Sequence, residues 1–134
     1  MRVLLVEDNP TLAKSLTDAL TQAHFTVDCM HDGEAADHVL RTQDYALVIL
    51  DLGLPKLDGL EVLRRIRSSE RTRLLPVVIL TSSAEERDIL EGYRLGTNSY
   101  VRKPVDFVEF TEAVRQLGLY WLLLNQPPPT SGIQ

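Results

Sequence analysis

YALVILDLGLPKLDG, residues 45–59, joins a short apolar run to an acid and then to a turn. The run from Tyr45 to Leu50 is continuous, contains β-branched side chains and is closed by turn residues, which is typical of a strand buried on both faces. Asp51 therefore stands at the carboxyl end of that strand, where ligands collect in an open parallel sheet. An acid in this position is by itself more often the first residue of a turn. A functional role for it depends on a second strand that also ends in acids.

Residues 2–6, RVLLV, form that second short apolar run, and it stops at Glu7 and Asp8. Asn9 comes next and either shapes an acidic pocket or caps the helix that Pro10 opens. Acids at the ends of two strands indicate a site at one edge of a sheet rather than two unrelated turns.

Strands and helices alternate five times along the chain. Three more strands are predicted at residues 25–30, 77–81 and 99–102, and helical apolar spacing separates the strands. This alternation predicts an α/β fold, a doubly wound parallel sheet of five strands with helices on both faces. Right-handed crossovers place the carboxyl ends of the strands at one edge.

Two of the helices carry more detailed expectations. The third has Arg64, Arg65 and Arg67 on its predicted outer face, and a basic cluster of this size is usually solvated. The fourth is predicted to turn Tyr93 inward and to end at Gly96.

Polar residues follow four of the predicted strands at the carboxyl edge, namely Glu7, Asp8, Asp51, Thr81 and Lys103. Carboxylates held this close repel one another, so either one keeps a proton or a divalent cation neutralises them. An all-oxygen site with room for water suits Mg²⁺ best. The lysine and the hydroxyl add donors that an anion with several oxygens needs, so the set predicts a site for a phosphoryl group.

The composition limits the class of protein. With 134 residues, 44% hydrophobic and 25% charged, the chain fits one globular domain, which we expect at residues 1–125, followed by a flexible proline-rich tail at 126–134. A net charge of −5 and a pI near 5.1 argue against direct nucleic-acid binding. The chain has a single cysteine, Cys29, and its apolar runs are too short for a signal peptide or a membrane span. Both observations favour the cytoplasm.

Four sequence blocks, VEDNP, VILDLGLPKLDG, ILTSS and YVRKP, together resemble the response-regulator receiver domains of two-component signalling. The likeness covers nearly the whole chain, and the blocks are specific in combination although each is weak alone. The resemblance implies a flavodoxin-like (βα)5 fold with strand order 2-1-3-4-5. It also implies a signalling receiver that catalyses its own phosphorylation and dephosphorylation, rather than an enzyme that acts on a separate substrate.

By that resemblance, Asp51 takes a phosphoryl group from a phosphohistidine of a histidine kinase or phosphotransfer protein. The resemblance also implies Mg²⁺ as cofactor. Asp8, Asp51 and the backbone carbonyl of Gly53 would bind the ion, and Glu7 would act through water.

The same resemblance implies that Lys103 pairs with the phosphoryl oxygens and that Thr81 and Tyr100 move as a switch. The readout surface would be the fourth helix, the fifth strand and the fifth helix. The peptide bond from Lys103 to Pro104 would be cis. Each of these three side chains also has a purely structural explanation. Lys103 would be a surface lysine, Thr81 the first residue of a helix, and Tyr100 a core residue.

The resemblance is uneven along the chain. The first half, to about Arg67, resembles the receivers of winged-helix transcription factors, and the second half resembles stand-alone receivers, including those that serve phytochrome kinases. Asn98 and Ser99 stand where the first group usually carries an acidic pair. The chain is therefore either a naturally divergent receiver or a fusion of two receiver halves joined within residues 67–75. The apolar segment Leu119–Leu124 is expected to be covered in a homodimer formed through the last helix.

Two other classes of function compete with a phosphorylatable switch. One is a non-switching interaction module that keeps the fold and has lost phosphotransfer, and the intact set of acids, threonine and lysine argues against it. The other is a small phosphatase, which would need a positioned general base and a substrate cavity that the sequence does not indicate.

Overall fold

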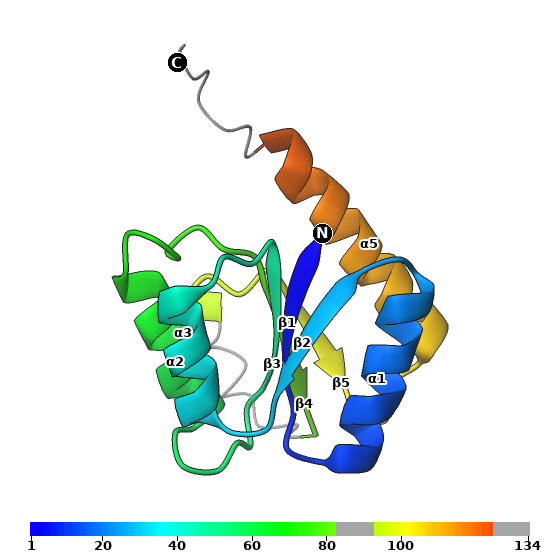
Figure 1. Ribbon diagram of the computed structural model, residues 1–134, viewed down its shortest axis with the longest axis horizontal. Coiled ribbons are helices and arrows are strands. Elements are labelled where there is room, and N and C mark those ends of the chain that lie inside the picture. Colours follow the sequence, from blue (N-terminus) through cyan, green and yellow to red (C-terminus); the bar gives the residue numbers. More distant parts are fainter. Residues whose placement is uncertain (83–92, 125–134) are drawn as a thin grey trace.

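The computed structural model describes residues 1–82 and 93–124, with the side chains of the last helix described as far as Leu117. Strands and helices alternate along these residues (Figure 1). The elements are β1 Arg2–Val6, α1 Pro10–Gln22, β2 Thr26–Met30, α2 Gly33–Thr42, β3 Leu47–Asp51, α3 Gly59–Ser68, β4 Val77–Thr81, β5 Ser99–Arg102 and α5 Phe107–Leu124. The tail predicted at 126–134 lies outside the described residues.

The strands form one parallel sheet in the order β2-β1-β3-β4-β5, which confirms the predicted doubly wound topology. Val6 pairs with Leu50, so Glu7 and Asp51 follow at the same level on neighbouring strands. Thr81 pairs with Arg102 on β5, and Lys103 comes one residue later. The register alone therefore brings the polar residues that follow β1, β3, β4 and β5 to one edge.

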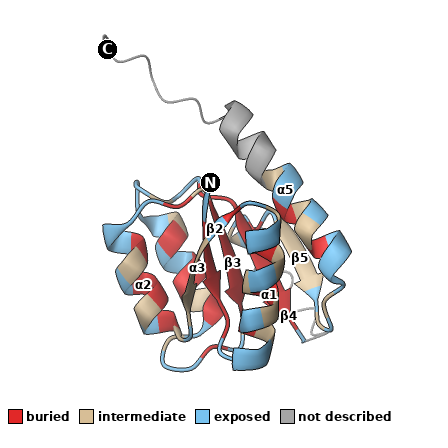
Figure 2. Ribbon diagram, turned by 45° about the vertical axis from the view of Figure 1, so that its right-hand side comes forward, coloured by how far each residue is buried: buried red, intermediate tan, exposed pale blue. Residues whose placement is uncertain are grey.

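Helices cover both faces of the sheet (Figures 1 and 2). On one face, α1 and α5 contribute buried side chains such as Leu16 and Phe110, and on the other α2 and α3 contribute Leu40 and Leu63. β3 and β4 are buried along their whole length, and β1 is buried after Arg2. Each fully buried leucine contributes roughly 1.5–3 kcal/mol, so the three central strands are a rigid platform for the residues at their ends.

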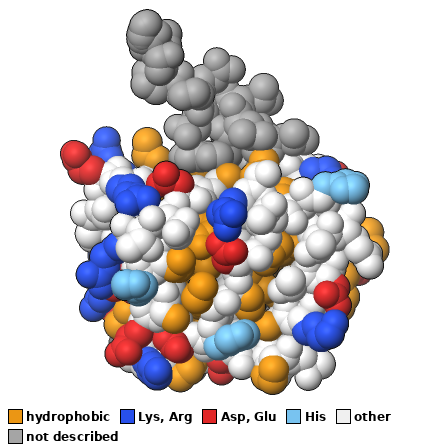
Figure 3. Space-filling view, in the orientation of Figure 1, with side chains coloured by type: hydrophobic (Ala, Val, Ile, Leu, Met, Phe, Trp, Pro, Cys, Tyr) orange, Lys and Arg blue, Asp and Glu red, His pale blue; other side chains and the backbone are white. Residues whose placement is uncertain are grey.

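β2 differs from the central strands because it lies at an edge of the sheet. Its residues after Thr26 are only half-buried. In the space-filling view of the face that looks onto this edge, hydrophobic side chains show as a band between the helices on either side (Figure 3).

Polar side chains cap the helices that begin at the carboxyl edge. Asn9 Oδ1 accepts hydrogen bonds from the backbone N–H groups of Thr11 and Leu12 at 3.0 and 3.1 Å. Asp32 and Asp58 cap α2 and α3 in the same way. Asn9 is therefore a helix cap, one of the two roles that the sequence left open.

Two expectations about helix faces are wrong. Tyr93, predicted to turn inward, is 57% exposed and packs on the ring of Tyr100, with the ring centroids 4.9 Å apart. It stands near the end of its helix, where the half-buried edge strand β5 supplies the nearest surface. Arg67, predicted to be solvated, is half-buried because backbone carbonyls beyond the end of α3 accept its hydrogen bonds.

Gly96 follows the expectation for a helix end. Its φ of 76° is the left-handed conformation that commonly stops a helix. No helix in the described part of the chain is both long and apolar enough to cross a membrane.

Candidate functional site

Strand alternation sets the direction of three of the predicted site residues. Side chains along a strand point alternately to the two faces of the sheet. Glu7 and Asp51 continue the rows of β1 and β3 that pack against α1 and α5, and Lys103 continues the row of Val101 on β5. The fold therefore turns two acids and one ammonium group toward a common point at the carboxyl edge.

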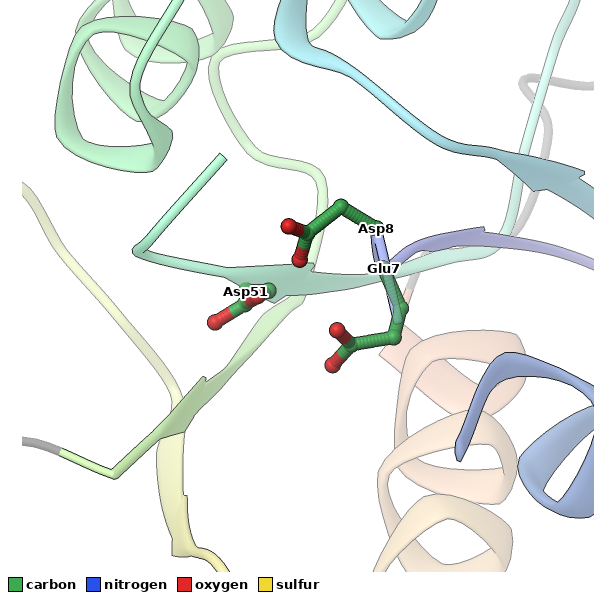
Figure 4. A group of neighbouring side chains, drawn as sticks. All are labelled: Glu7, Asp8 and Asp51. Carbon is green, nitrogen blue, oxygen red and sulfur yellow. The ribbon is translucent and has the colours of Figure 1, made fainter. Parts of the chain in front are cut away.

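Three carboxylates meet there (Figure 4). Glu7, Asp8 and Asp51 each offer one oxygen, and these oxygens lie within 4.8 Å of one another. Glu7 and Asp51 are buried, with 0% and 5% of the residue exposed, whereas Asp8 is open to solvent. The sequence predicted this convergence from strand ends that are far apart along the chain.

Lys103 lies between the two buried acids. Its Nζ is 2.9 Å from Glu7 Oε1 and 3.3 Å from Asp51 Oδ2. The backbone N–H of Asn9 donates to Glu7 Oε2 at 3.1 Å, and that of Gly53 donates to Asp51 Oδ1 at 3.3 Å. Glu7 Oε1 makes no hydrogen bond of standard geometry, so its contact with Lys103 is an ion pair and the buried oxygen has capacity for another ligand.

The electrostatic balance of the site favours added positive charge. Burial raises the pKa of Glu7, and the charge of Asp51 raises it further, although the contacts with Lys103 and Asn9 act in the opposite direction. Partial burial acts to lower the pKa of Lys103, but Glu7 and Asp51 outweigh this effect and the pKa rises. One ammonium group is thus shared by two buried carboxylates, with a third acid beside them.

These groups line a cavity of about 410 Å³ at the carboxyl edge. Its walls are Glu7, Asp8, Asn9, Asp51, Leu52, Gly53, Thr81, Ser82 and Lys103. The cavity brings together all five strand-end residues of the sequence prediction and also Gly53. Thr81 is buried in its wall, with 4% of the residue exposed.

Two polar residues near the cavity were missing from the predicted set. Ser82 lines the wall directly after Thr81. His31 Nδ1 is 3.2 Å from the backbone oxygen of Glu7, a residue of the cavity wall. The strand-end rule, if applied to β2 and extended by one residue after β4, would have found both.

The predicted switch residues lie on the neighbouring strands. Tyr100 on β5 is half-buried and contacts Tyr93, with the two rings tilted by 58°. The backbone N–H of Lys103 donates to the carbonyl oxygen of Thr81 at 2.9 Å, which couples the ends of β4 and β5. The Lys103–Pro104 peptide bond is cis.

The donor set fits a small, hard cation. An octahedral Mg²⁺ with bonds of about 2.0–2.1 Å places opposite ligands about 4.2 Å apart. The three carboxylate oxygens lie within 4.8 Å of one another, so small side-chain shifts or one bridging water suffice to bring them into that range. Glu7 Oε1 has no hydrogen-bond partner, and Gly53 lines the same cavity.

Comparison with protein families gives one match that spans most of the chain. The family described as response regulator receiver domain matches residues 3–115. Transcriptional regulatory protein TctD of Salmonella typhimurium (strain LT2) is 44% identical over 117 residues, which are 87% of this chain and 51% of the relative. The chain therefore spans about half the length of that curated relative.

Solved structures agree with the family match. The receiver domain of the sensor histidine kinase PA1611 from Pseudomonas aeruginosa, described with a magnesium ion coordinated in its active-site cleft, is 31% identical with a TM-score of 0.80. The likeness covers 87% of this chain and 96% of that one. The phosphorylated cyanobacterial phytochrome response regulator RcpA is 32% identical with a TM-score of 0.78, covering 96% of this chain and 98% of that one.

Proposed function

This chain belongs to the response regulator receiver domain family, and on that premise we propose that Asp51 accepts a phosphoryl group from a phosphohistidine of a histidine kinase or phosphotransfer protein. The observation that carries the proposal is the contact of Lys103 with both Glu7 and Asp51 in one cavity. A carboxylate with an adjacent ammonium group and two further acids is suited to hold a phosphoryl group and a divalent cation together.

In the proposed reaction, an oxygen of Asp51 attacks phosphorus and forms a P–O bond while the P–N bond to the donor histidine breaks. The electron pair of that bond stays on the imidazole nitrogen. Lys103, already 3.3 Å from Asp51 Oδ2, pairs with a phosphoryl oxygen, and the Thr81 hydroxyl donates to another. Asp8, Asp51 and the Gly53 carbonyl would hold Mg²⁺, with Glu7 acting through water, and the bound ion would neutralise charge on the phosphoryl group.

The proposed output is a switch of the surface formed by the fourth helix, β5 and α5. A phosphoryl group adds about two negative charges at neutral pH. Moving a population from mostly inactive to mostly active needs ~5.5 kcal/mol. Three charge-assisted hydrogen bonds at roughly 1.5–3 kcal/mol each supply that difference, provided that they form only in the active state. Thr81 and Tyr100 are the proposed moving residues because Thr81 lies on β4, which pairs with the strand of Asp51, and Tyr100 lies on β5, which pairs with β4.

The proposed partners are proteins. We place the phosphodonor against α1 around residues 11–15 and against the loop after Lys103, and we retain the proposal of a homodimer through the last helix. The side chains of Leu119–Leu124 lie outside the described residues. Light scattering at high micromolar concentration, with and without acetyl phosphate, tests the homodimer, and a monomer in both conditions contradicts it.

The net charge of −5 opposes direct nucleic-acid binding, and the single Cys29 is in keeping with a cytoplasmic protein.

A naturally divergent receiver and a fusion of two receiver halves remain the two explanations for the uneven resemblance, because a receiver of either origin aligns with its relatives over both halves. TctD aligns over 87% of this chain and RcpA over 96%, so each alignment includes part of both halves. A natural protein that is homologous to this chain from end to end at uniform similarity would exclude the fusion.

The decisive experiment is incubation with Mg²⁺ and acetyl phosphate, followed by mass spectrometry of the intact protein. We expect one added phosphoryl group on the wild type and none on Asp51→Asn. Asp44→Asn is the matched control, because the Asp44 side chain is 90% exposed and lies outside the cavity, and it should be phosphorylated as the wild type is. A wild type that gains no phosphoryl group favours the non-switching module, and a phosphoryl group that persists on Asp51→Asn excludes Asp51 as the acceptor.

A further inference from the structure

Arg67 is held in an unusual way for an arginine of a helix face. Its guanidinium donates hydrogen bonds to four backbone carbonyls, those of Leu95 at 2.8 Å, Arg73 at 3.1 Å, Leu75 at 2.7 Å and Gly96 at 2.6 Å. Guanidinium carries five N–H groups in a fixed fork, so four of the five are used. Burial lowers the pKa of Arg67, and no carboxylate of the described residues lies within ion-pair distance of it.

Its neighbours on the same helix behave differently. Arg65 pairs with Asp37 at 2.9 Å and Arg64 lies 3.4 Å from Glu61, and both arginine side chains are nearly half exposed. The Arg64–Glu61 contact is a surface ion pair, which contributes little to stability, whereas the side chain of Asp37, the partner of Arg65, is largely buried. Among the contacts between described residues, only Arg67 of the three arginines donates to backbone carbonyls outside α3.

The carbonyls that Arg67 reaches belong to two segments with one feature in common. Residues 73–75 lead into β4, and residues 95–96 lead into β5. One side chain from α3 thus binds the segments just before the amino ends of both strands. A Cβ atom added to Gly96 would lie 3.1 Å from Arg67 Nε, so the turn and the guanidinium are closely packed.

Asn98 makes a second tie at the same place. Its Oδ1 accepts from the backbone N–H of Val77 at 2.8 Å, and its own N–H donates to the Val77 carbonyl oxygen at 2.9 Å. Asn98 is one of the two residues at which this chain departs from the acidic pair named above. The amino ends of β4 and β5 are therefore joined both by a side-chain clamp and by a reciprocal pair.

We propose that Arg67 and Asn98 are positioning residues that pin the amino ends of β4 and β5, so that the phosphorylation-linked movement is confined to the carboxyl ends of these strands. This inference rests on the proposed function, because Thr81, which that function moves, and Lys103, which it pairs with the phosphoryl group, lie at the carboxyl ends of these strands. Because the amino ends of β4 and β5 are fixed, a displacement of Thr81 moves the carboxyl end of β5 and does not shift β4 as a whole.

Amide hydrogen exchange tests the inference first in the wild type. Exchange is measured in Mg²⁺ with and without acetyl phosphate, and the phosphoryl mass is recorded in each sample. We expect phosphorylation to change exchange at residues 101–103 and to leave residues 95–98 unchanged. An equal change in both segments overturns the inference.

Arg67→Lys and Arg64→Lys form the matched pair of variants. Lysine keeps the charge but presents a single ammonium group, which does not serve four carbonyls. Without acetyl phosphate, exchange at residues 95–98 should rise about tenfold in Arg67→Lys relative to β1, as expected for the loss of a single charge-assisted bond, and should stay at the wild-type rate in Arg64→Lys. With acetyl phosphate, the phosphorylation-linked change should extend into residues 95–98 only in Arg67→Lys.

The outcomes separate this inference from the proposed function. If the phosphoryl mass is absent from every sample, the proposed function fails, and the unphosphorylated comparison still tests the clamp. If the mass is present and Arg67→Lys behaves as Arg64→Lys does, the clamp fails and the proposed function stands. Asn98→Ala provides the same comparison through the second tie if Arg67→Lys does not fold.

Discussion

The two ends of the sheet treat buried charge in opposite ways. At the carboxyl edge, Glu7 and Asp51 are buried side by side and share one ammonium group, and Glu7 keeps a buried oxygen without a hydrogen bond. At the amino edge, Arg67 uses four of its N–H groups on carbonyls, and Asp28 accepts hydrogen bonds from Tyr45 and Arg2. Charges at the amino edge are satisfied within the chain, and charges at the carboxyl edge are not.

The difference assigns separate tasks to the two edges. Charged groups that are hydrogen-bonded gain little from a further ligand, so those at the amino edge contribute to stability, although the buried Thr97 Oγ1 before β5 has no hydrogen-bond partner. Buried carboxylates that share one ammonium group repel each other, and a bound cation reduces this repulsion. The carboxyl edge therefore destabilises the fold when it is empty and stabilises it when a cation is bound. Substitutions at the two edges should therefore affect stability and phosphorylation separately.

The largest effect is expected at the amino edge. Arg67→Met should lower the free energy of unfolding by about 3 kcal/mol, because four backbone carbonyls lose a charged donor. The two segments to which these carbonyls belong, residues 73–75 and 95–96, also lose their shared contact with α3. Urea unfolding monitored by circular dichroism measures this loss. At 10 °C and low urea, the folded variant should still gain the phosphoryl group on Asp51.

Loss of phosphorylation in folded Arg67→Met would contradict the conclusion that the amino edge serves stability and only the carboxyl edge serves phosphorylation. Arg64→Met is the control from the same helix, and its free energy of unfolding should lie within about 0.5 kcal/mol of the wild type, as for other surface substitutions.

Mg²⁺ should act on the carboxyl edge with the next largest effect. A cation at 100 times its Kd stabilises the folded state by about 2.7 kcal/mol. The wild type should therefore unfold at a higher temperature in Mg²⁺ than in EDTA, and Asp8→Asn should lose most of the difference because one of three carboxylates is gone. Equal stabilisation of the wild type and Asp8→Asn would show that the ion binds elsewhere.

Lys103→Met removes the shared counter-charge and keeps the volume of the side chain. Without Mg²⁺ at pH 7, the free energy of unfolding should fall by about 1–2 kcal/mol, a value reduced for the 21% exposure of the lysine side chain. Mg²⁺ should restore most of this stability, whereas the yield of phosphorylated protein should stay low, since no ammonium group remains to hold the phosphoryl oxygens. A variant that phosphorylates as fast as the wild type would limit Lys103 to a structural role.

Much of the carboxyl edge was predictable from sequence because its signals are local. Continuous apolar runs that stop at Asp51 and at Glu7 identify strands and their ends. Parallel pairing and right-handed connections then require those ends to meet, whatever the details of the packing. The convergence of Thr81 and Lys103 on the same cavity follows from this reasoning, whereas the sheet order was implied by the resemblance to receiver domains.

The amino edge was not predictable because its contacts depend on loop geometry. Arg64, Arg65 and Arg67 look equivalent in a helical pattern, and only the path of the segments before β4 and β5 brings four carbonyls to Arg67. Tyr93 was placed on the wrong side of its helix for a related reason, because an edge strand gives no enclosed core near the helix end.

The smallest effect concerns pH and has opposite signs at the two edges. Burial raises the pKa of Glu7 above its ordinary value of 4.5, so the folded state holds a proton that the unfolded state has lost in the interval between the two pKa values. Stability without Mg²⁺ should therefore increase as the pH falls from neutral toward 4.5. Glu7→Gln should abolish this increase in the midpoint of urea unfolding.

Asp28 at the amino edge has the reverse behaviour. The hydrogen bond from Tyr45 lowers the pKa of Asp28 below its ordinary value of 3.8, and Arg2 adds to this against the effect of burial. The stability that Asp28 contributes is present above pH 3.8 and is lost as the pH falls through the folded-state pKa. Tyr45→Phe should cost about 1 kcal/mol at pH 7 and flatten the loss of stability below pH 3.8, while the rise from neutral toward pH 4.5 that depends on Glu7 persists. If Tyr45→Phe and Glu7→Gln altered the same part of the pH profile, the two edges would not be electrostatically independent, and the separation of stability from function along the strands would fail with them.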